Sequence, residues 1–365
     1  MVYRAIGLMS GSSLDGLDIA FVEFNENAGN WSYEILNAIC SPYDEVWKEK
    51  LKNATTLSAK EYLLLHADYG HYVGQTVKKF IDSNKIDYQV SLIASHGHTT
   101  FHLPEKKMTA QLGDGAAIAA ETGLAVVSDL RALDLALGGQ GAPIVPIGES
   151  MLLGDYEYFL NLGGIANISL KSDRYIAFDV CPANRVLNML SNEAGKEFDQ
   201  NGKLASAGQI NTELLEKLNA LDYYKKPFPK SLANEFGTDV VYPMIRDTRC
   251  EIQDGLRTYV EHIAIQIKKA IANTKNSKLQ AAGYKLLATG GGALNHFLVE
   301  RIRANLQELN IELIIPDEKM VNFKEALVMA FIGVLRWRQE NNVLSSVTGA
   351  LRDSIGGAVW TGHEE

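Results

Sequence analysis

The chain has 365 residues, of which 46% are apolar and 22% are charged; this composition argues against a disordered, a collagen-like or a membrane protein. Because 35 basic and 44 acidic residues give a net charge of −9, we expect no nucleic-acid partner and no attraction to anionic membranes. The three cysteines, Cys40, Cys181 and Cys250, are far apart and form no Cys-x-x-Cys pair, which fits neither a disulfide framework nor a zinc site. Without a targeting segment near Met1, a cytoplasmic location is the simplest expectation.

Short apolar runs alternate with helical stretches along the chain, a pattern that predicts an α/β fold with largely parallel sheets. Strands are predicted at residues 3–9, 17–24, 90–94, 124–128, 156–162, 165–170, 175–179, 284–289 and 311–315. The clearest helices are expected at 253–273 and 323–339, where apolar residues recur every three or four positions. Packing against the core is enough to explain the apolar residues of both helices.

The order strand, glycine-rich turn, strand occurs twice, near residues 7–18 and 156–167. Two such hairpins, each opening an α/β half, predict an internal duplication with a cleft between the halves. The glycine-rich stretch 138–143 is the predicted crossing between them. We therefore expect one domain at residues 1–145, to which 345–365 return, and a second at 146–345.

Glycine-rich turns follow apolar strands at residues 11–18, 163–167 and 290–295. Glycine lets backbone N–H groups approach an anion closely, although each turn alone is equally well explained as a tight hairpin. The chain contains neither a P-loop nor a complete G-x-G-x-x-G motif. In the first turn the hydroxyls of Ser12 and Ser13 stand beside Asp15 and Asp18, which suits Mg²⁺ bridging a carboxylate and a phosphate. The alternative is that Asp15-Gly16 is an ordinary turn dipeptide.

Polar residues follow three predicted strands, at 95–99, at 128–131 and at Asp179. Ligands of open α/β sheets bind at this edge. Asp179 lies among apolar residues, so desolvation would raise its pKa towards that of a general base. The alternative is an aspartate that caps a turn before Pro182.

Three histidines, His96, His98 and His102, invite comparison with a zinc site. Their spacing is unspecific on a loop, and no cysteine completes a ligand set. Hydrogen bonds to a sugar or to the backbone are the favoured interpretation, with contact between His98 and a sugar left open.

Taken together, these segments resemble the anhydro-N-acetylmuramic acid kinase family of the sugar kinase, Hsp70 and actin superfamily. The resemblance covers nearly the whole chain. It rests on GLMSGSSLDGLD at 7–18, SHGHT at 95–99, QLGD at 111–114, SDLR at 128–131, GGQGAP at 138–143, NLGGIAN at 161–167, FD at 178–179, PKS at 229–231, TGGGALN at 289–295, EA at 325–326 and VTGA at 347–350.

The resemblance implies a two-domain actin-like (ribonuclease H-like) sugar kinase with an interdomain cleft. Its substrates would be ATP, with Mg²⁺, and an amino sugar, 1,6-anhydro-N-acetylmuramic acid, in cell-wall recycling; a homodimer is also implied. Asp179 would be the catalytic base. The sugar would contact Thr99, Arg131 and Glu325. ATP would be bound by Gly11, Ser12, Ser13, Leu14, Asp15, Gly16, Leu17, Asp18, Gly163, Gly164, Gly290, Gly291 and Gly292, with Asp15 and Asp18 serving the metal.

The segment after the expected base departs from the family pattern. The family usually reads FDTGPGN, whereas this chain has FDVCPAN at 178–184. His98 replaces a customary glutamine, and Asn188 replaces a customary aspartate. Side chains at Cys181 and Ala183 in place of glycines would narrow the site or change the turn. Two alternatives therefore stay open: a kinase for another amino sugar, and a sugar or nucleotide sensor without turnover.

Overall fold

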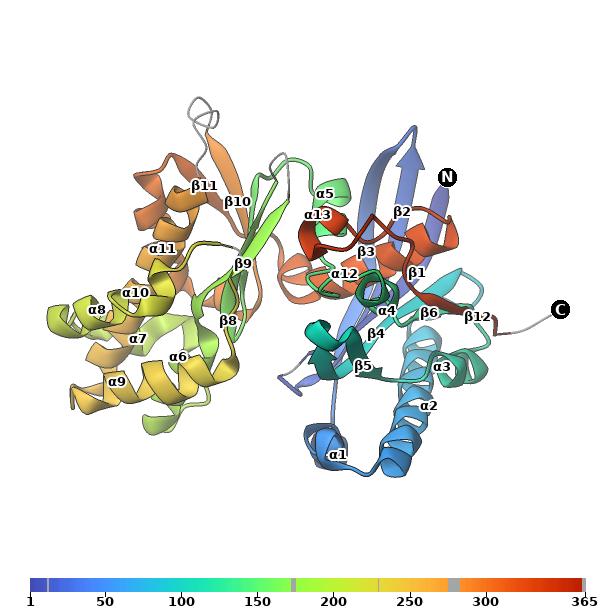
Figure 1. The fold of residues 1–365 in the computed structure, drawn as a ribbon, viewed down its shortest axis with the longest axis horizontal. Coiled ribbons are helices and arrows are strands. Elements are labelled where there is room, and N and C mark those ends of the chain that lie inside the picture. Colours follow the sequence, from blue (N-terminus) through green and yellow to red (C-terminus); the bar gives the residue numbers. More distant parts are fainter. Residues whose placement is uncertain (12, 172–174, 229, 275–282, 363–365) are drawn as a thin grey trace. The chain divides into compact units, whose positions relative to one another are not determined.

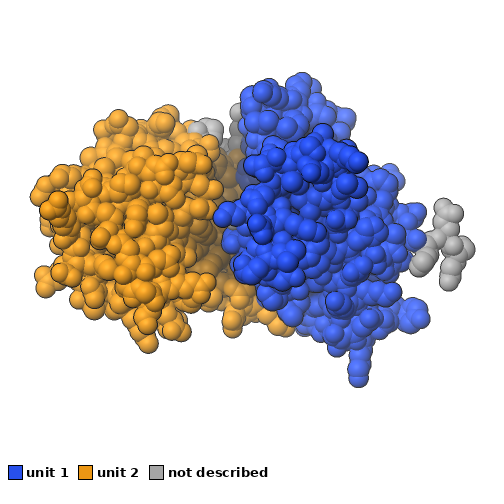
Figure 2. Space-filling view, turned by 90° about the horizontal axis from the view of Figure 1, so that it is seen from below, with its two compact units in different colours: residues 1–154, 323–365 blue, residues 155–322 orange. Residues whose placement is uncertain are grey.

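The computed structural model describes residues 1–365 apart from 12, 172–174, 229, 275–282 and 363–365. The chain forms two compact units: unit 1 comprises residues 1–154 and 323–365, and unit 2 comprises residues 155–322 (Figure 2). Each unit has its own sheet and its own apolar core. The chain therefore passes from one unit to the other twice, after residue 154 and after residue 322.

Unit 1 is built on a seven-stranded sheet in the order β12-β6-β4-β1-β2-β3, with β5 paired to β4 (Figure 1). Its strands are β1 (Val2–Ser10), β2 (Gly16–Asn27), β3 (Asn30–Pro42), β4 (Leu92–Leu103), β5 (Met108–Leu112), β6 (Val126–Ser128) and β12 (Ala358–Trp360). Its helices are α1 (Glu45–Lys52), α2 (Ala59–Asn84), α3 (Gly115–Thr122), α4 (Ala132–Ala136), α5 (Pro146–Leu152) and α13 (Ser345–Thr348). Helix α12 (Glu318–Trp337) begins in unit 2 and continues into unit 1.

Strand β1 shows why the first sheet is covered on both faces. Side chains alternate between the two faces of a strand. Ile6 and Leu8 are fully buried in one core with Val73 of α2. Gly7, which points the other way, is in close contact with α12, because a Cβ built there would lie 1.8 Å from the carbonyl oxygen of Ala326. Only glycine allows the returning helix to approach the sheet so closely.

Unit 2 has a five-stranded sheet in the order β11-β10-β7-β8-β9. Its strands are β7 (Tyr158–Leu162), β8 (Ile165–Leu170), β9 (Ile176–Pro182), β10 (Tyr284–Thr289) and β11 (Ile311–Ile314). Its helices are α6 (Asn184–Glu193), α7 (Lys203–Ala207), α8 (Thr212–Asn219), α9 (Tyr242–Asp247), α10 (Ile252–Thr274) and α11 (His296–Gln307). The predicted stripe of α10 is confirmed as core, since its members are fully buried: Leu256, Val260, Ile263, Ile267 and Ile271.

The two sheets repeat one topology, which confirms the duplication predicted from the glycine-rich hairpins. In unit 1, β1, β2 and β3 are antiparallel neighbours, and β4 and β6 continue the sheet in parallel with β1. In unit 2, β7, β8 and β9 take the same places, followed by β10 and β11. The predicted α/β fold class is confirmed.

The prediction of largely parallel sheets is wrong, because both sheets are mixed. Strands joined by short turns have to pair antiparallel, whereas parallel pairing needs a long crossover. The sequence also gave no prediction for β3, β5 and β12. Strand β3 lies at the edge of its sheet with one buried residue among 13, and β12 has only three residues, so neither carries a strong apolar pattern.

Residues 138–143, the predicted crossing, lie inside unit 1 and enclose a buried carboxylate. Asp134 is fully buried, and its Oδ2 atom accepts a hydrogen bond from the Gly141 amide at 2.7 Å. Its Oδ1 atom accepts one from the Thr348 hydroxyl at 2.7 Å. A Cβ at Gly139 would lie 2.2 Å from the same carboxylate. The glycines therefore serve a close approach within one unit.

Two expectations about the whole chain can be compared with the structure. Cys40, Cys181 and Cys250 are all free, as predicted. Across the part of the chain that the structure describes, no helix combines the length and apolar character needed to cross a bilayer.

A buried ion pair joins the two segments of unit 1 that lead to and from unit 2. Lys324 of α12 lies 2.9 Å from Glu149 of α5, and the two side chains are only 6% and 4% exposed. Glu149 precedes the passage after residue 154, and Lys324 follows the passage after residue 322. The pair thus fixes both passages to the core of unit 1.

We expect Lys324→Met to lower the free energy of unfolding by about 3–5 kcal/mol, because it deprives the buried Glu149 carboxylate of its cation. Urea denaturation of the full chain, followed by far-ultraviolet circular dichroism, measures this change and reports on both units. Lys217→Met is the matched control, since Lys217 forms an exposed ion pair with Glu213 and its loss should cost less than about 1 kcal/mol. Equal effects of the two substitutions would contradict the role given to Lys324.

Candidate functional site

The first glycine-rich turn connects β1 to β2, and the carboxylate of Asp15 accepts hydrogen bonds within it. The Oδ1 atom of Asp15 accepts hydrogen bonds from the Ser13 hydroxyl at 2.7 Å and from the Gly16 amide at 3.0 Å. Leu14 adopts a left-handed conformation with φ of 58°, which bends the chain sharply. Ser12, also predicted to bind ATP, lies outside the described residues. Asp15 and Ser13 are exposed, so a ligand can reach them.

The next three predicted ATP residues have different environments on β2. Gly16 meets β3 closely, because a Cβ there would lie 2.5 Å from the Ser41 carbonyl oxygen. Leu17 is buried in the core, so only its backbone is available to a ligand. Asp18 is half-buried; desolvation raises its pKa to about 6, against the opposing effect of a hydrogen bond with the Cys40 thiol. Asp18 therefore bears a charge that its surroundings do not fully compensate.

Arg131 is oriented by two acceptors of unit 1. Its Nε atom donates to Nε2 of His96 at 2.9 Å, and one terminal nitrogen donates to the Gly141 carbonyl at 2.7 Å. Burial lowers the pKa of Arg131 to about 10, while the charge of Glu325 opposes this change. Burial likewise raises the pKa of Glu325. The structure thus brings Arg131 and Glu325, both predicted to bind sugar, close enough to interact electrostatically.

His96 must be neutral to accept from Arg131. Burial and the neighbouring guanidinium lower its pKa to about 3. Its Nδ1 atom donates to the Gly97 carbonyl at 2.9 Å, which leaves Nε2 as the acceptor. This histidine therefore fixes Arg131 through a single tautomer.

The other two histidines have partners of their own. His98 is buried and its Nδ1 atom lies 3.0 Å from the Ser10 hydroxyl, which also accepts a hydrogen bond from Tyr43. His102 bonds to Thr109. Among the described residues there is no group of three or more potential metal-ligating side chains. Both rings thus bond to hydroxyl side chains of unit 1, and contact between His98 and a sugar stays a prediction.

Thr99, the third predicted sugar residue, lies on β4 and is exposed. Its hydroxyl accepts a weak hydrogen bond from Gln111 at 3.3 Å. The two residues face each other on β4 and β5. Thr99 is thus accessible on the same unit as Arg131.

Asp179 lies in the middle of β9 in unit 2, whereas the strand predicted from the sequence ends at this residue. Its Oδ2 atom accepts a hydrogen bond from the Leu232 amide at 2.8 Å, and its own amide donates to the Lys230 carbonyl at 3.0 Å. Tyr223 donates to the carbonyl oxygen of Asp179 at 2.6 Å. Desolvation raises the pKa of the carboxyl group, and the Leu232 hydrogen bond opposes this. The other oxygen, Oδ1, has no hydrogen bond to a described residue and is free to accept from a substrate.

Asp179 belongs to a polar row across the second sheet. The register aligns Thr289, Asn161, Asn167 and Asp179 on four neighbouring strands. Directly opposed residues share one face of a sheet. A β-bulge beside Asn167 changes the local direction of the strand, as bulges next to active sites often do. The row places the amide of Asn167 on the strand next to Asp179 and that of Asn161 one strand further.

The second and third glycine turns, at residues 163–164 and 290–292, pack together. Asn184 joins them, because its Nδ2 atom donates to the Leu162 carbonyl at 2.9 Å and its Oδ1 atom would lie 3.0 Å from a Cβ at Gly292. Gly290 has φ of 82°, and a Cβ there would lie 2.4 Å from Oδ1 of Asn161. No other residue fits these positions without movement.

Two buried polar atoms at these turns have no hydrogen-bond partner among the described residues: Oγ1 of Thr289 and Nε of Arg185. Buried donors and acceptors are normally satisfied, so such atoms call for an explanation. Glycines at close approaches and unsatisfied donors fit a site for a phosphate-bearing ligand.

Two carboxylates at the first turn are the candidate ligands of Mg²⁺. Asp15 and Asp18 offer two carboxylates but no third protein ligand, as no larger cluster exists in the described residues. Mg²⁺ in kinases is typically held by one or two carboxylates together with phosphates and water. The residues therefore fit Mg²⁺ that arrives with a nucleotide.

The altered segment after Asp179 does not reach a surface. Val180, Cys181 and Ala183 are at most 2% exposed and belong to the core of unit 2. The side chains of Cys181 and Ala183 pack into this core, and the expectation that they narrow the site or change the turn stays a prediction.

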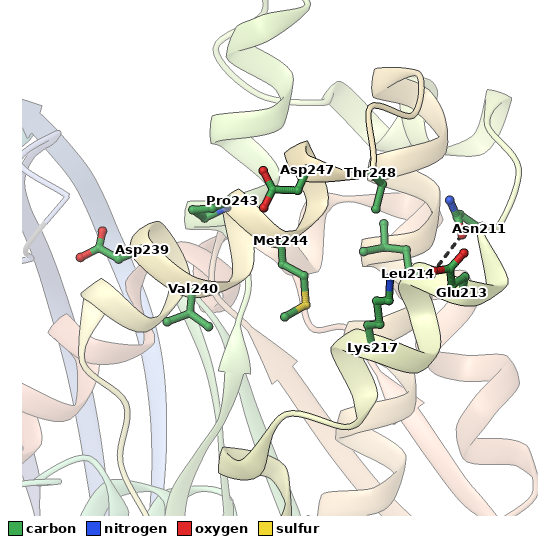
Figure 3. A pocket seen from close by; sticks show the side chains of 10 residues that line it. All are labelled: Asn211, Glu213, Leu214, Lys217, Asp239, Val240, Pro243, Met244, Asp247 and Thr248. Atoms are coloured by element: carbon green, nitrogen blue, oxygen red, sulfur yellow. Dashed lines mark hydrogen bonds and ion pairs between the residues drawn. The ribbon is translucent and has the colours of Figure 1, made fainter.

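Unit 2 also has a surface pocket of about 670 Å³ (Figure 3). It is lined by Asn211, Glu213, Leu214, Lys217, Asp239, Val240, Pro243, Met244, Asp247 and Thr248. Figure 3 shows α8 on one side and the helical segment from Asp239 to Thr248 on the other. None of the predicted site residues lines this pocket.

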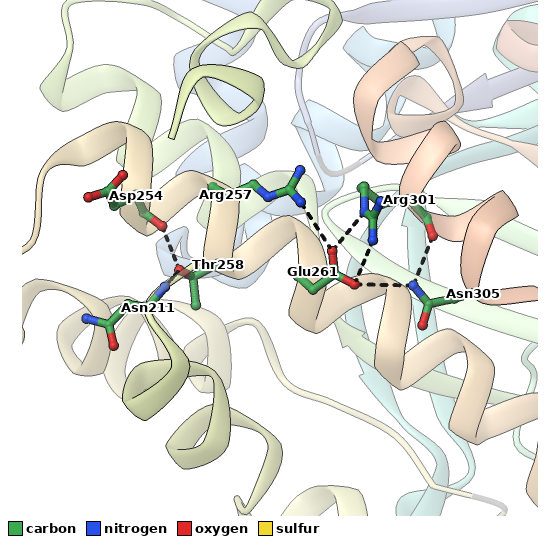
Figure 4. A network of polar contacts seen from close by, with 7 residues as sticks. All are labelled: Asn211, Asp254, Arg257, Thr258, Glu261, Arg301 and Asn305. Atoms are coloured by element: carbon green, nitrogen blue, oxygen red, sulfur yellow. Dashed lines mark hydrogen bonds and ion pairs between the residues drawn. The ribbon is translucent and has the colours of Figure 1, made fainter. Parts of the chain in front are cut away.

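A charged cluster between α10 and α11 is structural (Figure 4). Glu261, 7% exposed, accepts from Nε of Arg301 at 2.8 Å and from Asn305 at 3.3 Å. Arg257 lies 3.9 Å away and its guanidinium covers the ring of Phe297. Both arginines share the Glu261 carboxylate, which joins the two helices.

The sequence did not identify His96 as the partner of Arg131, nor Arg185 beside the second turn. In each case the two partners are far apart in the sequence and belong to no common motif. Only the fold brings them together. The SHGHT segment singled out His96, but the favoured partners were a sugar or the backbone and not an arginine side chain.

We expect Asp18→Asn to raise the melting temperature at pH 7.5 by a few degrees. The folded protein holds a proton on Asp18 up to about pH 6, whereas the unfolded chain releases it near 3.8, so wild-type stability falls as pH rises through this window. The difference between variant and wild type should vanish below pH 3.8. Calorimetric melting at several pH values measures it. Asp247→Asn, at an exposed position, is the control; a pH-independent difference would contradict the assignment.

Residues 3–362 match the family described as anhydro-N-acetylmuramic acid kinase. A protein of that name from Aliivibrio fischeri is 33% identical over 98% of this chain and 99% of its own length. One from Sulfurimonas denitrificans is 32% identical over 97% and 98%. A solved structure, the activator of a 2-hydroxyisocaproyl-CoA dehydratase from Clostridium difficile, overlaps with 92% of this chain and 97% of its own at 12% identity and a TM-score of 0.45, too low to carry an argument. The full-length match shows that the chain belongs to the anhydro-N-acetylmuramic acid kinase family.

Proposed function

We propose that this protein is an ATP-dependent kinase that opens 1,6-anhydro-N-acetylmuramic acid with water and phosphorylates O6. The products are N-acetylmuramic acid 6-phosphate and ADP, and the reaction serves peptidoglycan recycling in the cytoplasm. The observation that carries the proposal is the geometry of Asp179 in a chain that belongs to this family throughout its length. Asp179 has a fixed carboxylate, a raised pKa and one oxygen available, which are the properties of a general base.

Asp179 acts on a water molecule in the proposed reaction. The Oδ1 atom accepts a proton from the water, whose oxygen forms a bond to the anomeric carbon, C1. The bond between C1 and O6 breaks, and O6 bonds to the γ-phosphorus while the bond to the ADP oxygen breaks. The proton on Asp179 returns to solvent. Hydrogen bonding from Leu232 keeps the carboxylate in one orientation throughout.

Unit 1 supplies charged and polar groups for both substrates. Arg131, fixed by His96 and the Gly141 carbonyl, and Glu325 hold the sugar, with Thr99 as a further hydrogen-bonding group. The first turn holds the ATP phosphates through its backbone and the Ser13 hydroxyl. Asp15 and Asp18 hold Mg²⁺, which neutralises phosphate charge when bound.

The substrate is tested by measuring ADP release with Mg²⁺-ATP and each of three sugars. We expect clear turnover with 1,6-anhydro-N-acetylmuramic acid and little with N-acetylmuramic acid or N-acetylglucosamine, because only the anhydro sugar has the C1–O6 bond that water opens. Preference for another amino sugar would replace the proposed substrate. Absence of sugar-dependent ADP release from folded protein would contradict kinase activity altogether.

Asp179→Asn should reduce turnover at least ~100-fold, the usual scale for loss of a general base, with ATP affinity nearly unchanged. Steady-state kinetics and calorimetric titration measure the two quantities. In wild-type protein kcat/KM should fall at acidic pH as Asp179 becomes protonated, with the midpoint above the usual aspartate pKa because burial raises it. Asp247→Asn is the matched control in the same unit. Near-normal turnover in Asp179→Asn would remove Asp179 from the mechanism.

A further inference from the structure

Arg185 is attached by its backbone to the second glycine turn. The amides of Ala183 and Asn184 donate to the carbonyls of Gly164 and Gly163 at 2.8 and 3.1 Å. The Arg185 amide donates to the Gly164 carbonyl at 3.4 Å. The first amides of α6 are therefore used within the protein and do not face a ligand. Their effect is to hold Arg185 at a fixed place beside the turn.

The side chain of Arg185 runs alongside Gly164. A Cβ built at Gly164 would lie 3.9 Å from both Cβ and Nε of Arg185. Gly164 is exposed and Arg185 is half-buried. The absence of a side chain at Gly164 thus leaves open space next to the start of the guanidinium group.

The charge of Arg185 is not neutralised within the described residues. Its Nε atom is buried and has no hydrogen-bond partner there, and no carboxylate of the described residues forms an ion pair with it. Arginine stays protonated, so the group carries a full positive charge and five donors. Leaving such donors unsatisfied is unfavourable. An acceptor brought by a ligand would remove that penalty.

Other arginines of unit 2 show the contrast. Arg301 donates two hydrogen bonds to Glu261, and Arg246 lies 2.8 Å from Glu193. Those guanidinium groups are held by carboxylates and are structural. Arg185 has a comparably fixed position, but no carboxylate of the described residues pairs with it. This is so although the chain has an excess of acidic residues and a net charge of −9.

We propose that Arg185 binds a phosphate group of the nucleotide beside the Gly163–Gly164 turn. Guanidinium groups match phosphate oxygens with paired donors, and glycine turns allow backbone amides to approach the same anion. The inference rests on the proposed function for the identity of the nucleotide. It adds a side-chain ligand to a turn that otherwise offers only backbone.

The test is a calorimetric titration of wild type, Arg185→Ala and Arg185→Lys with Mg²⁺-ATP, ADP and adenosine. We expect Arg185→Ala to weaken binding of at least one of the two phosphorylated ligands about tenfold or more, with adenosine binding unchanged. The nucleotide affinity of Arg185→Lys should lie between those of wild type and Arg185→Ala, since lysine keeps the charge but not the paired donors. Arg303→Ala is the matched control, because Arg303 is an exposed arginine of the same unit.

Three results would overturn the inference. Unchanged affinity of Arg185→Ala for both ATP and ADP would exclude phosphate contact. Equal weakening for adenosine, with a lowered melting temperature, would show a structural role instead. Finally, Arg185→Ala could raise only the KM for the anhydro sugar, and leave the KM unchanged for a sugar without the lactyl carboxylate. That result would show that Arg185 binds the carboxylate of the sugar.

The outcome for the kinase proposal is separate. Nucleotide binding that depends on Arg185, without ADP release on any sugar, would support the phosphate contact and contradict the kinase. Failure of wild-type protein to bind any nucleotide would contradict both.

Discussion

The short glycine-rich turn between the first two strands of each sheet is the constraint on which the rest of the molecule depends. A turn of this length forces antiparallel pairing, so the third strand continues the meander and later strands join on the other side of the first strand. In unit 1 this pairs Ser10, at the start of the turn, with His98 of β4. In unit 2 it places Asn161 between Thr289 and Asn167. Each turn therefore gathers the polar ends of its neighbouring strands at one edge.

Charged groups in the two units divide into those with protein partners and those without. Glu261 with Arg301, and Glu149 with Lys324, are buried pairs that tie helices together. Buried ions of this kind need close partners, because desolvation is costly. Asp18 and Arg185 lack full compensation, and both lie at glycine turns. Functional sites often retain such unfavourable arrangements, which a bound substrate relieves.

The neighbourhood of Arg131 shows how a neutral histidine positions a cation. A protonated His96 would repel the guanidinium, whereas burial keeps the ring neutral across physiological pH. Two nitrogens of the Arg131 guanidinium group donate hydrogen bonds to acceptors within unit 1. Asp179 is treated differently, since a single backbone amide holds one oxygen and leaves the other free. One unit thus presents a fixed cation and the other a fixed base.

The sequence by itself determined the α/β class, the duplicated hairpins, most strands and the buried stripe of α10, because apolar periodicity and glycine turns are local signals. The family resemblance named the residues expected at the site, Asp179 and Arg131 among them. Only the tertiary structure decided the mixed pairing of the sheets, the burial of Cys181 and Ala183, and the bond from Arg131 to His96. These three features depend on contacts between residues far apart in the chain and on which face of a strand packs against the core. A short sequence motif does not contain either kind of information.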